Sequence, residues 1–107
     1  MNANPVMLVV SVPTKHADKL RKALGEAGAG VWGNYSHCSF SYKGIGRFKP
    51  KPGANPAYGK VGELAEIEEE RIEILCDESH MSAIVEALRK NHPYEEPAFH
   101  YYPVRIG

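Results

Sequence analysis

The stretch His92-Pro93-Tyr94-Glu95-Glu96-Pro97 follows an amphipathic helical pattern and precedes the last predicted strand of this 107-residue chain. Proline fixes its own φ angle and pushes the preceding residue out of the helical region. The helix must therefore end near Asn91, and a rigid connector must lead to Ala98. A flexible loop does not need such stiffening, so we expect Tyr94 and Glu95 to be held in place. Two interpretations stay open: a structural corner in which Tyr94 caps the core, or a pocket wall shared between subunits.

The residues before this corner predict a strand and then a helix. Apolar residues recur at positions i, i+3, i+4 and i+7 of a helix, namely Met81, Ile84, Val85 and Leu88. Ser79 is the predicted N-cap of this helix. In the preceding strand, residues 63–76, the apolar residues change parity between Ile67 and Ile72. This change of face predicts a bulge or a strong twist near residues 68–70; alternatively, the first half of the strand covers a neighbouring subunit.

The first half of the chain predicts a strand, a helix and a long second strand. Residues 6–12 are apolar and largely β-branched, which is typical of a central strand covered on both faces. Pro13 ends this strand, and Thr14 is the predicted N-cap of a helix that Gly28 closes. Residues 31–48 alternate, with one parity containing Trp32, Cys38, Phe40 and Tyr42 and the other containing Tyr35, His37, Ser39 and Ser41.

The order strand, helix, strand, strand, helix, strand predicts an α+β, ferredoxin-like βαββαβ fold within a single domain, residues 1–107. Its four-stranded antiparallel sheet would carry both helices on one face. The open face would then carry Tyr35, His37 and aromatic residues of the last strand, residues 99–104. Soluble monomers rarely expose a large apolar patch, so the sequence predicts a homo-oligomer.

The composition narrows the range of functions. Thirteen basic and thirteen acidic residues give no net charge, which argues against non-specific nucleic-acid binding and against recruitment to acidic membranes. The apolar run of residues 6–12 is too short for a membrane span or a signal peptide, so we expect a cytoplasmic protein. A predicted hairpin centre near Gly53 places Cys38 opposite about residue 69, so we expect Cys38 and Cys76 to be buried free thiols.

Five residues are candidates for ligand binding. They are Tyr35, His37, Asn55, Tyr94 and Glu95. Tyr35 and His37 would act across a subunit interface from the open face. Asn55 lies in the Pro/Gly-rich stretch of residues 49–60, which either forms an anion-binding nest flanked by lysines or is a simple hairpin tip.

A divalent metal ion is the candidate cofactor. His92 and Glu95 could supply two ligands at the corner, and His37 or His100 of a neighbouring copy could add a third. The alternative is that these side chains have structural roles. The chain contains no readable Ser/His/Asp set, and we expect His37 and Cys38 to point to opposite faces of a strand, so we predict no catalytic residues.

Most of the chain resembles one known module. The matching segments are residues 28–40, 44–48, 52–56, 70–73 and the proline corner. They are similar to the PII/CutA-like domain inserted in bacterial members of the NGG-interacting-factor-three-like family, also described as GTP cyclohydrolase I type 2 homologues. From Asn91 to Val104 the chain also resembles the end of the CutA divalent-ion-tolerance proteins, which are trimeric and related in shape to PII signalling proteins.

The resemblance implies an oligomeric, preferably trimeric, module rather than an enzyme. In the full-length family a separate domain carries a two-metal site of His, Asp and Glu, and none of those motifs can be located here. We therefore expect a module that binds a small ligand or divalent ion in clefts between subunits. The alternative is a purely structural or protein-partner module, and a metal-dependent hydrolase ranks third.

Overall fold

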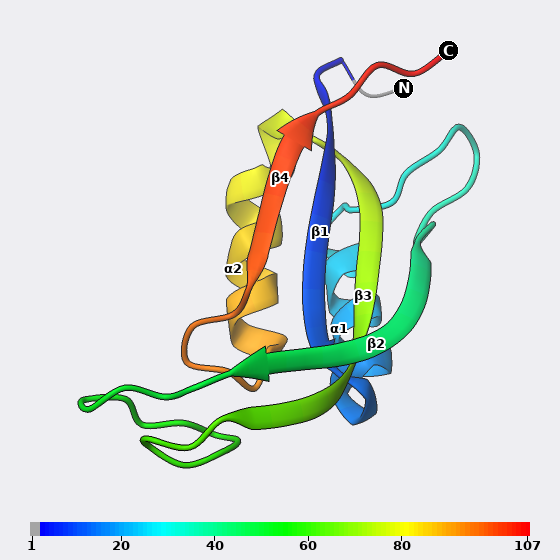
Figure 1. Cartoon of the computed structure of the whole chain (residues 1–107). Helices are drawn as coiled ribbons and strands as arrows, with labels where there is room; N and C mark the ends of the chain where they lie inside the picture. Colours follow the sequence, from blue (N-terminus) through cyan, green and yellow to red (C-terminus); the bar gives the residue numbers. More distant parts are fainter. Residues whose placement is uncertain (1–2) are drawn as a thin grey trace.

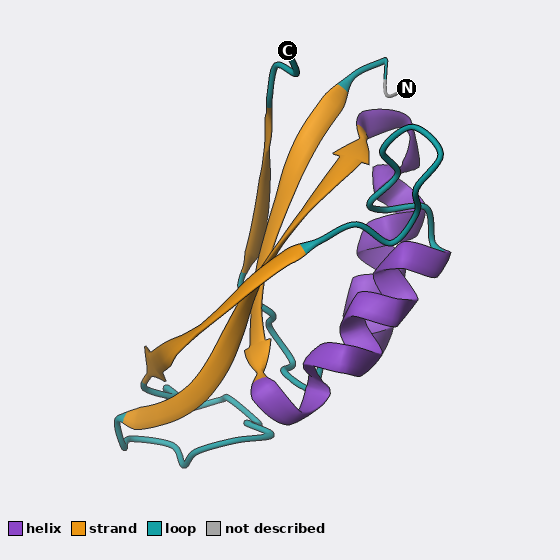
Figure 2. Cartoon of the chain, turned by 90° about the vertical axis from the view of Figure 1, so that its right-hand side faces the viewer, coloured by secondary structure: helices purple, strands orange, loops and turns teal. Residues whose placement is uncertain are grey.

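The computed structural model describes residues 3–107 and contains one antiparallel four-stranded sheet with two helices on one face (Figures 1 and 2). The elements are β1 (Pro5–Pro13), α1 (Ala17–Glu26), β2 (Phe40–Phe48), β3 (Ala65–Asp77), α2 (Met81–Asn91) and β4 (Phe99–Pro103). The strand order is β2-β3-β1-β4, which confirms the predicted ferredoxin-like arrangement. Within the described part of the chain, no helix has the length and apolar character needed to cross a membrane.

The hydrophobic core lies between the sheet and the two helices. Its largest fully buried side chains are Leu8, Leu20, Leu24, Ile72, Ile74, Ile84 and Leu88. Burial alternates along strand β1, as expected for a strand with only one face in the core. Met7 and Ser11, on the face away from the helices, are only half-buried. The prediction that β1 is covered on both faces is therefore wrong within one copy, although Val9 on that face is buried.

Neither helix uses the predicted N-cap. Each begins with a short 3₁₀ turn, Thr14–His16 before α1 and Glu78–His80 before α2, and the Thr14 side chain makes no capping bond. The cap of the second turn is Asp77, whose side chain accepts from the Ser79 backbone N–H at 3.1 Å, so Ser79 is the capped residue. The predicted end of α2 at Asn91 is confirmed, because His92 is already extended.

Residues 31–39 form a loop, so the prediction of a strand from residue 31 is wrong. The strand begins at Phe40, and every residue from 31 to 39 is exposed. Gly30, Gly33 and His37 adopt positive φ angles, which an extended strand does not permit. Cys38 is consequently exposed rather than buried. Cys76 is buried as predicted, burial raises the pKa of its thiol to about 12, and both cysteines are free.

Strand β3 bends instead of forming a bulge. Its pairing with β2 runs without a break from Phe40 opposite Glu73 to Phe48 opposite Ala65, and its pairing with β1 is also continuous. The β2–β3 ribbon curves away from the helices (Figure 2), so the predicted strong twist explains the change of face and the predicted bulge is wrong. The register centres the connection at residues 56–57 rather than at Gly53.

The Asp77 cap generates a pH-dependent prediction. Donation from the Ser79 hydroxyl, together with the backbone N–H groups of Asn4 and Ser79, lowers the pKa of Asp77 from 3.8 to about 2. A carboxylate with a lowered folded pKa stabilises the fold above its unfolded pKa and loses that contribution as the pH falls through the folded pKa. We expect Asp77→Asn to lower the free energy of unfolding at neutral pH, measured by urea titration. The gap from wild type should narrow between pH values of about 4 and about 2; a constant gap would contradict this role.

Candidate functional site

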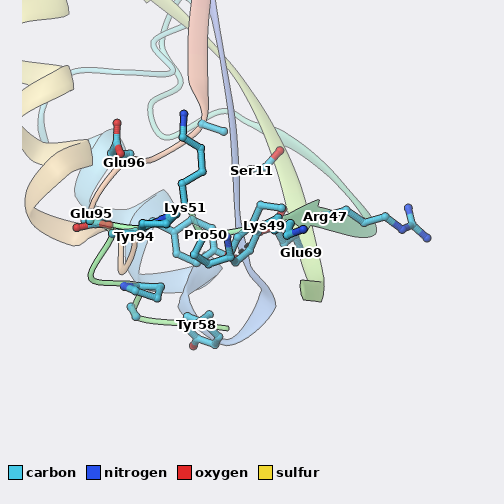
Figure 3. A pocket seen from close by; sticks show the side chains of 18 residues that line it. Ser11, Arg47, Lys49, Pro50, Lys51, Tyr58, Glu69, Tyr94, Glu95 and Glu96 are labelled. Atoms are coloured by element: carbon cyan, nitrogen blue, oxygen red, sulfur yellow. Dashed lines mark hydrogen bonds between the residues drawn. The ribbon is translucent and has the colours of Figure 1, made fainter. Parts of the chain in front are cut away.

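A pocket of about 710 Å³, open to solvent, lies where the proline corner meets the long β2–β3 loop (Figure 3). Its walls come from five parts of the chain: Ser11 of β1, the end of β2, the loop residues 49–58, Glu69 of β3, and residues 94–98. The corner brings these parts together because Pro93 and Pro97 prevent the chain from continuing as a helix.

Tyr94 stands at the centre of this site. Its ring contacts the rings of Phe48, Tyr58 and His92 edge-on or tilted, with centroid distances of 5.5, 5.7 and 5.0 Å. Its hydroxyl donates a hydrogen bond of 2.7 Å to Oε2 of Glu69. Tyr94 therefore packs as a structural residue and also lines the pocket.

The hydroxyl of Tyr94 remains a donor over the physiological range. Burial, and then the hydrogen bond to the Glu69 carboxylate, raise the pKa of the phenol. Glu69 itself is only 8% exposed, and a Cβ atom added at Gly46 would lie 2.0 Å from its Oε1 atom. The absence of a side chain at Gly46 thus provides the space for the Glu69 carboxylate.

Glu69 was missed by the sequence analysis, which names no glutamate of this strand as a site residue. The available signal was the pair Gly44 and Gly46 in the middle of β2. A glycine inside a strand often marks a close approach by another group.

The side chain of His92 links the proline corner to strand β1 through hydrogen bonds. It is buried, its Nε2 atom lies 2.7 Å from the Ser11 carbonyl oxygen, and its Nδ1 atom accepts from the Tyr94 backbone N–H at 3.1 Å. Burial lowers the pKa of His92, which favours the neutral ring with its proton on Nε2. Both ring nitrogens therefore have protein partners, and neither offers a free lone pair to a metal ion.

The long loop is attached to the corner by polar and aromatic contacts. The backbone N–H of Asn55 donates to Oε1 of Glu95 at 3.0 Å, so two predicted ligand-binding residues do meet. On the other side of the loop, the Tyr58 hydroxyl lies 2.9 Å from Nε2 of His16. These contacts, with the Tyr58–Tyr94 ring contact, place the loop over the end of the sheet.

The pocket offers charges of both signs. In the view of Figure 3, Glu95 and Glu96 lie on one side, Lys49 and Glu69 lie on the other, and Lys51 extends between them. Among residues 3–107, neither lysine has a carboxylate oxygen within 4.0 Å. The ammonium groups are thus available to an anionic ligand, and the exposed glutamates to a cationic group.

The segment of residues 31–39, which contains Tyr35 and His37, lies at the opposite end of the sheet from the proline corner (Figure 1). The His37 ring rests on Gly25 of α1, where an added Cβ would lie 2.1 Å from its Cδ2 atom. Tyr35 and His37 are therefore far from the other predicted ligand-binding residues within one copy. For the same reason, the three predicted metal ligands His92, Glu95 and His37 do not come together within one copy. Across the described residues, no group of three or more His, Cys, Asp or Glu side chains is placed to hold a metal ion.

Comparison with solved structures first defines the class of fold. CutA from Archaeoglobus fulgidus, described as a periplasmic divalent cation tolerance protein, superposes with a TM-score of 0.69 over 96% of this chain and 86% of that chain, at 13% identity. CutA1 from Shewanella sp. SIB1 gives a TM-score of 0.70 at 19% identity over 100% of this chain and 87% of that chain. The chain therefore has a CutA-like fold. No family model matches it.

Sequence comparison then gives named relatives. A protein named GTP cyclohydrolase 1 type 2 homolog from Halalkalibacterium halodurans is 53% identical over 97 residues, and its namesake from Bacillus subtilis is 50% identical over 97 residues. A Bacillus cereus protein related to NIF3 superposes with a TM-score of 0.84 at 44% identity, over 96% of this chain. The chain corresponds to the CutA-like domain of NIF3-like proteins, as the sequence predicts.

The match covers only part of those relatives. The chain spans about a quarter of their length: 26% of the two named homologues and 26% of the Bacillus cereus chain. The name GTP cyclohydrolase 1 type 2 homolog therefore describes proteins of which this domain is one part.

The close fit between Gly46 and Glu69 generates a prediction with a matched control. Gly46→Ala must displace the Glu69 carboxylate and break its bond to Tyr94, so we expect the free energy of unfolding to fall by about 1–3 kcal/mol. Gly44→Ala, on the same face of β2, meets nothing within 4 Å and should leave the stability unchanged or slightly higher. Urea unfolding measures both variants. Equal losses would show that Glu69 is not held as described.

Proposed function

We propose that this chain is a self-associating module that contacts further copies through its open sheet face and binds a small ligand in its corner pocket, at the border between copies. The observation that carries self-association is the aromatic character of the open face. The proposal for ligand binding is supported by the mixed charges and aromatic walls of the pocket.

The open face combines exposed aromatic rings with a half-covered apolar centre. The register places on it Met7 and Val9 of β1, Phe40 and Tyr42 of β2, Leu75 of β3, and His100 and Tyr102 of β4. Phe40, Tyr42 and Tyr102 are 68%, 45% and 46% exposed. Both helices cover the other face, so no helix covers this one (Figure 2). The same register also places Arg71 and Glu73 of β3 on this face, so its aromatic and apolar surface is interrupted by charges. Exposed aromatic surfaces are typical of contacts between protein chains.

The pocket favours a small organic ligand over a bare metal ion. A divalent ion needs several convergent oxygen or nitrogen ligands, and His92 has already engaged both ring nitrogens. An organic ligand with an acidic group could instead pair with Lys49 or Lys51 and place an apolar part on Tyr94. Glu95 is exposed and lines the pocket, and we propose that it takes part in binding.

A module that only contacts other protein chains is the second candidate, and the exposed aromatic residues favour it. Replacing Glu95 by Gln distinguishes the two, because it keeps the shape of the side chain and removes its charge. Loss of a bound ligand with retention of the assembly favours the pocket. We propose no cyclohydrolase activity for this chain, and turnover of GTP by purified, metal-supplemented protein that a single substitution abolishes would contradict this.

Two neighbouring tyrosines test the use of the open face. Tyr102 pairs with Met7 and lies on the open face, whereas Tyr101 pairs with Leu8 and lies on the face that carries the helices. Their exposed fractions are similar, 46% for Tyr102 and 43% for Tyr101. We expect Tyr102→Asp to dissociate the assembly, because it places a charge in an apolar contact. Tyr101→Asp should leave the assembly intact, as measured by sedimentation at micromolar concentration.

The outcome against the proposal is equally specific. A wild-type protein that sediments only as the 11.8 kDa species would rule out self-association. Dissociation by Tyr101→Asp alone would place the contact on the other face of β4.

A further inference from the structure

The loop of residues 31–39 lies at the end of the sheet opposite the proline corner (Figure 1) and carries exposed aromatic side chains. We call this segment the aromatic loop. Trp32 and Tyr35 are 51% and 72% exposed, and Phe40, directly after the loop, is 68% exposed. The loop contains no Asp, Glu, Lys or Arg. It is therefore an uncharged surface whose aromatic residues are at least half exposed.

The aromatic loop is held in a defined shape. Trp32 and Tyr35 exchange two backbone hydrogen bonds, of 2.9 and 3.0 Å, across a tight turn with Gly33 at a φ of 59°. Its start is fixed by the Gly30 N–H, which donates to the Leu75 carbonyl, and its end by the Cys38 N–H, which donates to the Gly30 carbonyl. Rings displayed by a preorganised loop lose little conformational entropy when they are buried by a partner.

The corner pocket has the complementary surface. Its apolar walls are rings of aromatic and proline residues, namely Phe48, Pro50, Pro52, Pro56, Tyr58 and Tyr94. Such walls suit the flat face of an indole, and the free ammonium groups of Lys49 and Lys51 can lie over its π-system. Loop and pocket lie at opposite ends of one copy, so they can meet only between two copies.

We propose that the aromatic loop of one copy enters the corner pocket of a second copy, with Trp32 as the inserted side chain. This inference rests on the proposed self-association and supplies the wall that closes the ligand site. It also brings Tyr35 and His37 of one copy to Asn55, Tyr94 and Glu95 of another. Because two different surfaces meet, the contact is head to tail and repeats until a ring closes.

The area involved indicates how this contact relates to the open face. A fully buried aromatic side chain covers roughly 150–250 Å², so the exposed parts of Trp32, Tyr35 and Phe40 represent about 350 Å². Adding the pocket surface gives roughly 700 Å², whereas stable interfaces bury about 1,200–2,000 Å². The loop contact therefore complements the open-face contact and does not replace it.

Trp32 is the only tryptophan of the chain, so its fluorescence reports this contact directly. In the wild-type assembly we expect short-wavelength emission and weak quenching by acrylamide. Ala57→Arg places a long charged side chain at the exposed rim of the pocket, and it should shift the emission to longer wavelength and increase quenching. Ala83→Arg, on the exposed surface of α2, is the matched control and should change neither value.

A mixing experiment separates the loop contact from general dissociation. A Trp32→Ala chain keeps an intact pocket but emits no tryptophan fluorescence, and an Ala57→Arg chain keeps Trp32 but has a blocked pocket. Adding the first to the second should restore shielding of Trp32, whereas adding a chain with both substitutions should not.

The possible negative results distinguish the loop contact from self-association. A multi-chain wild type in which Trp32 stays fully quenchable, or in which mixing restores nothing, would overturn the loop contact while self-association stands. A wild type that is a single chain at every concentration would overturn both proposals.

Discussion

The hydrogen bond from the Tyr94 hydroxyl to the Glu69 carboxylate is the interaction on which the candidate site depends. It joins the connector after α2 to the middle of β3, and the rings of Phe48 and Tyr58 then pack against Tyr94. The bond requires a glycine at position 46, because any side chain there would displace the carboxylate. The pocket thus follows from a rigid corner, a buried acid and a gap in the neighbouring strand.

The bend of β3 explains how so small a chain can build both a core and a pocket. Its second half directs Ile72 and Ile74 into the core beneath the helices. Its first half directs Glu69 to the other face, towards Tyr94. Both helices lie on the core face and leave the open face without cover, which is the physical reason to propose that further copies of the chain complete the structure.

The sequence predicts the fold well because its strongest signals are local and periodic. The order of elements and the end of α2 at Asn91 follow from apolar spacing and proline geometry. The pattern could not show that residues 31–39 form a loop, since their alternation imitates a strand. Glu69 was missed because its burial depends on groups distant in sequence, Gly46 and Tyr94.

The central claim is that copies of this chain assemble and enclose a ligand site between them. Native mass spectrometry of protein purified without ligand removal tests both parts in one spectrum. The account predicts a mass that is a multiple of 11.8 kDa, together with added mass from a retained small molecule. A spectrum that contains only the 11.8 kDa chain, at concentrations where the fold is intact, would contradict the claim.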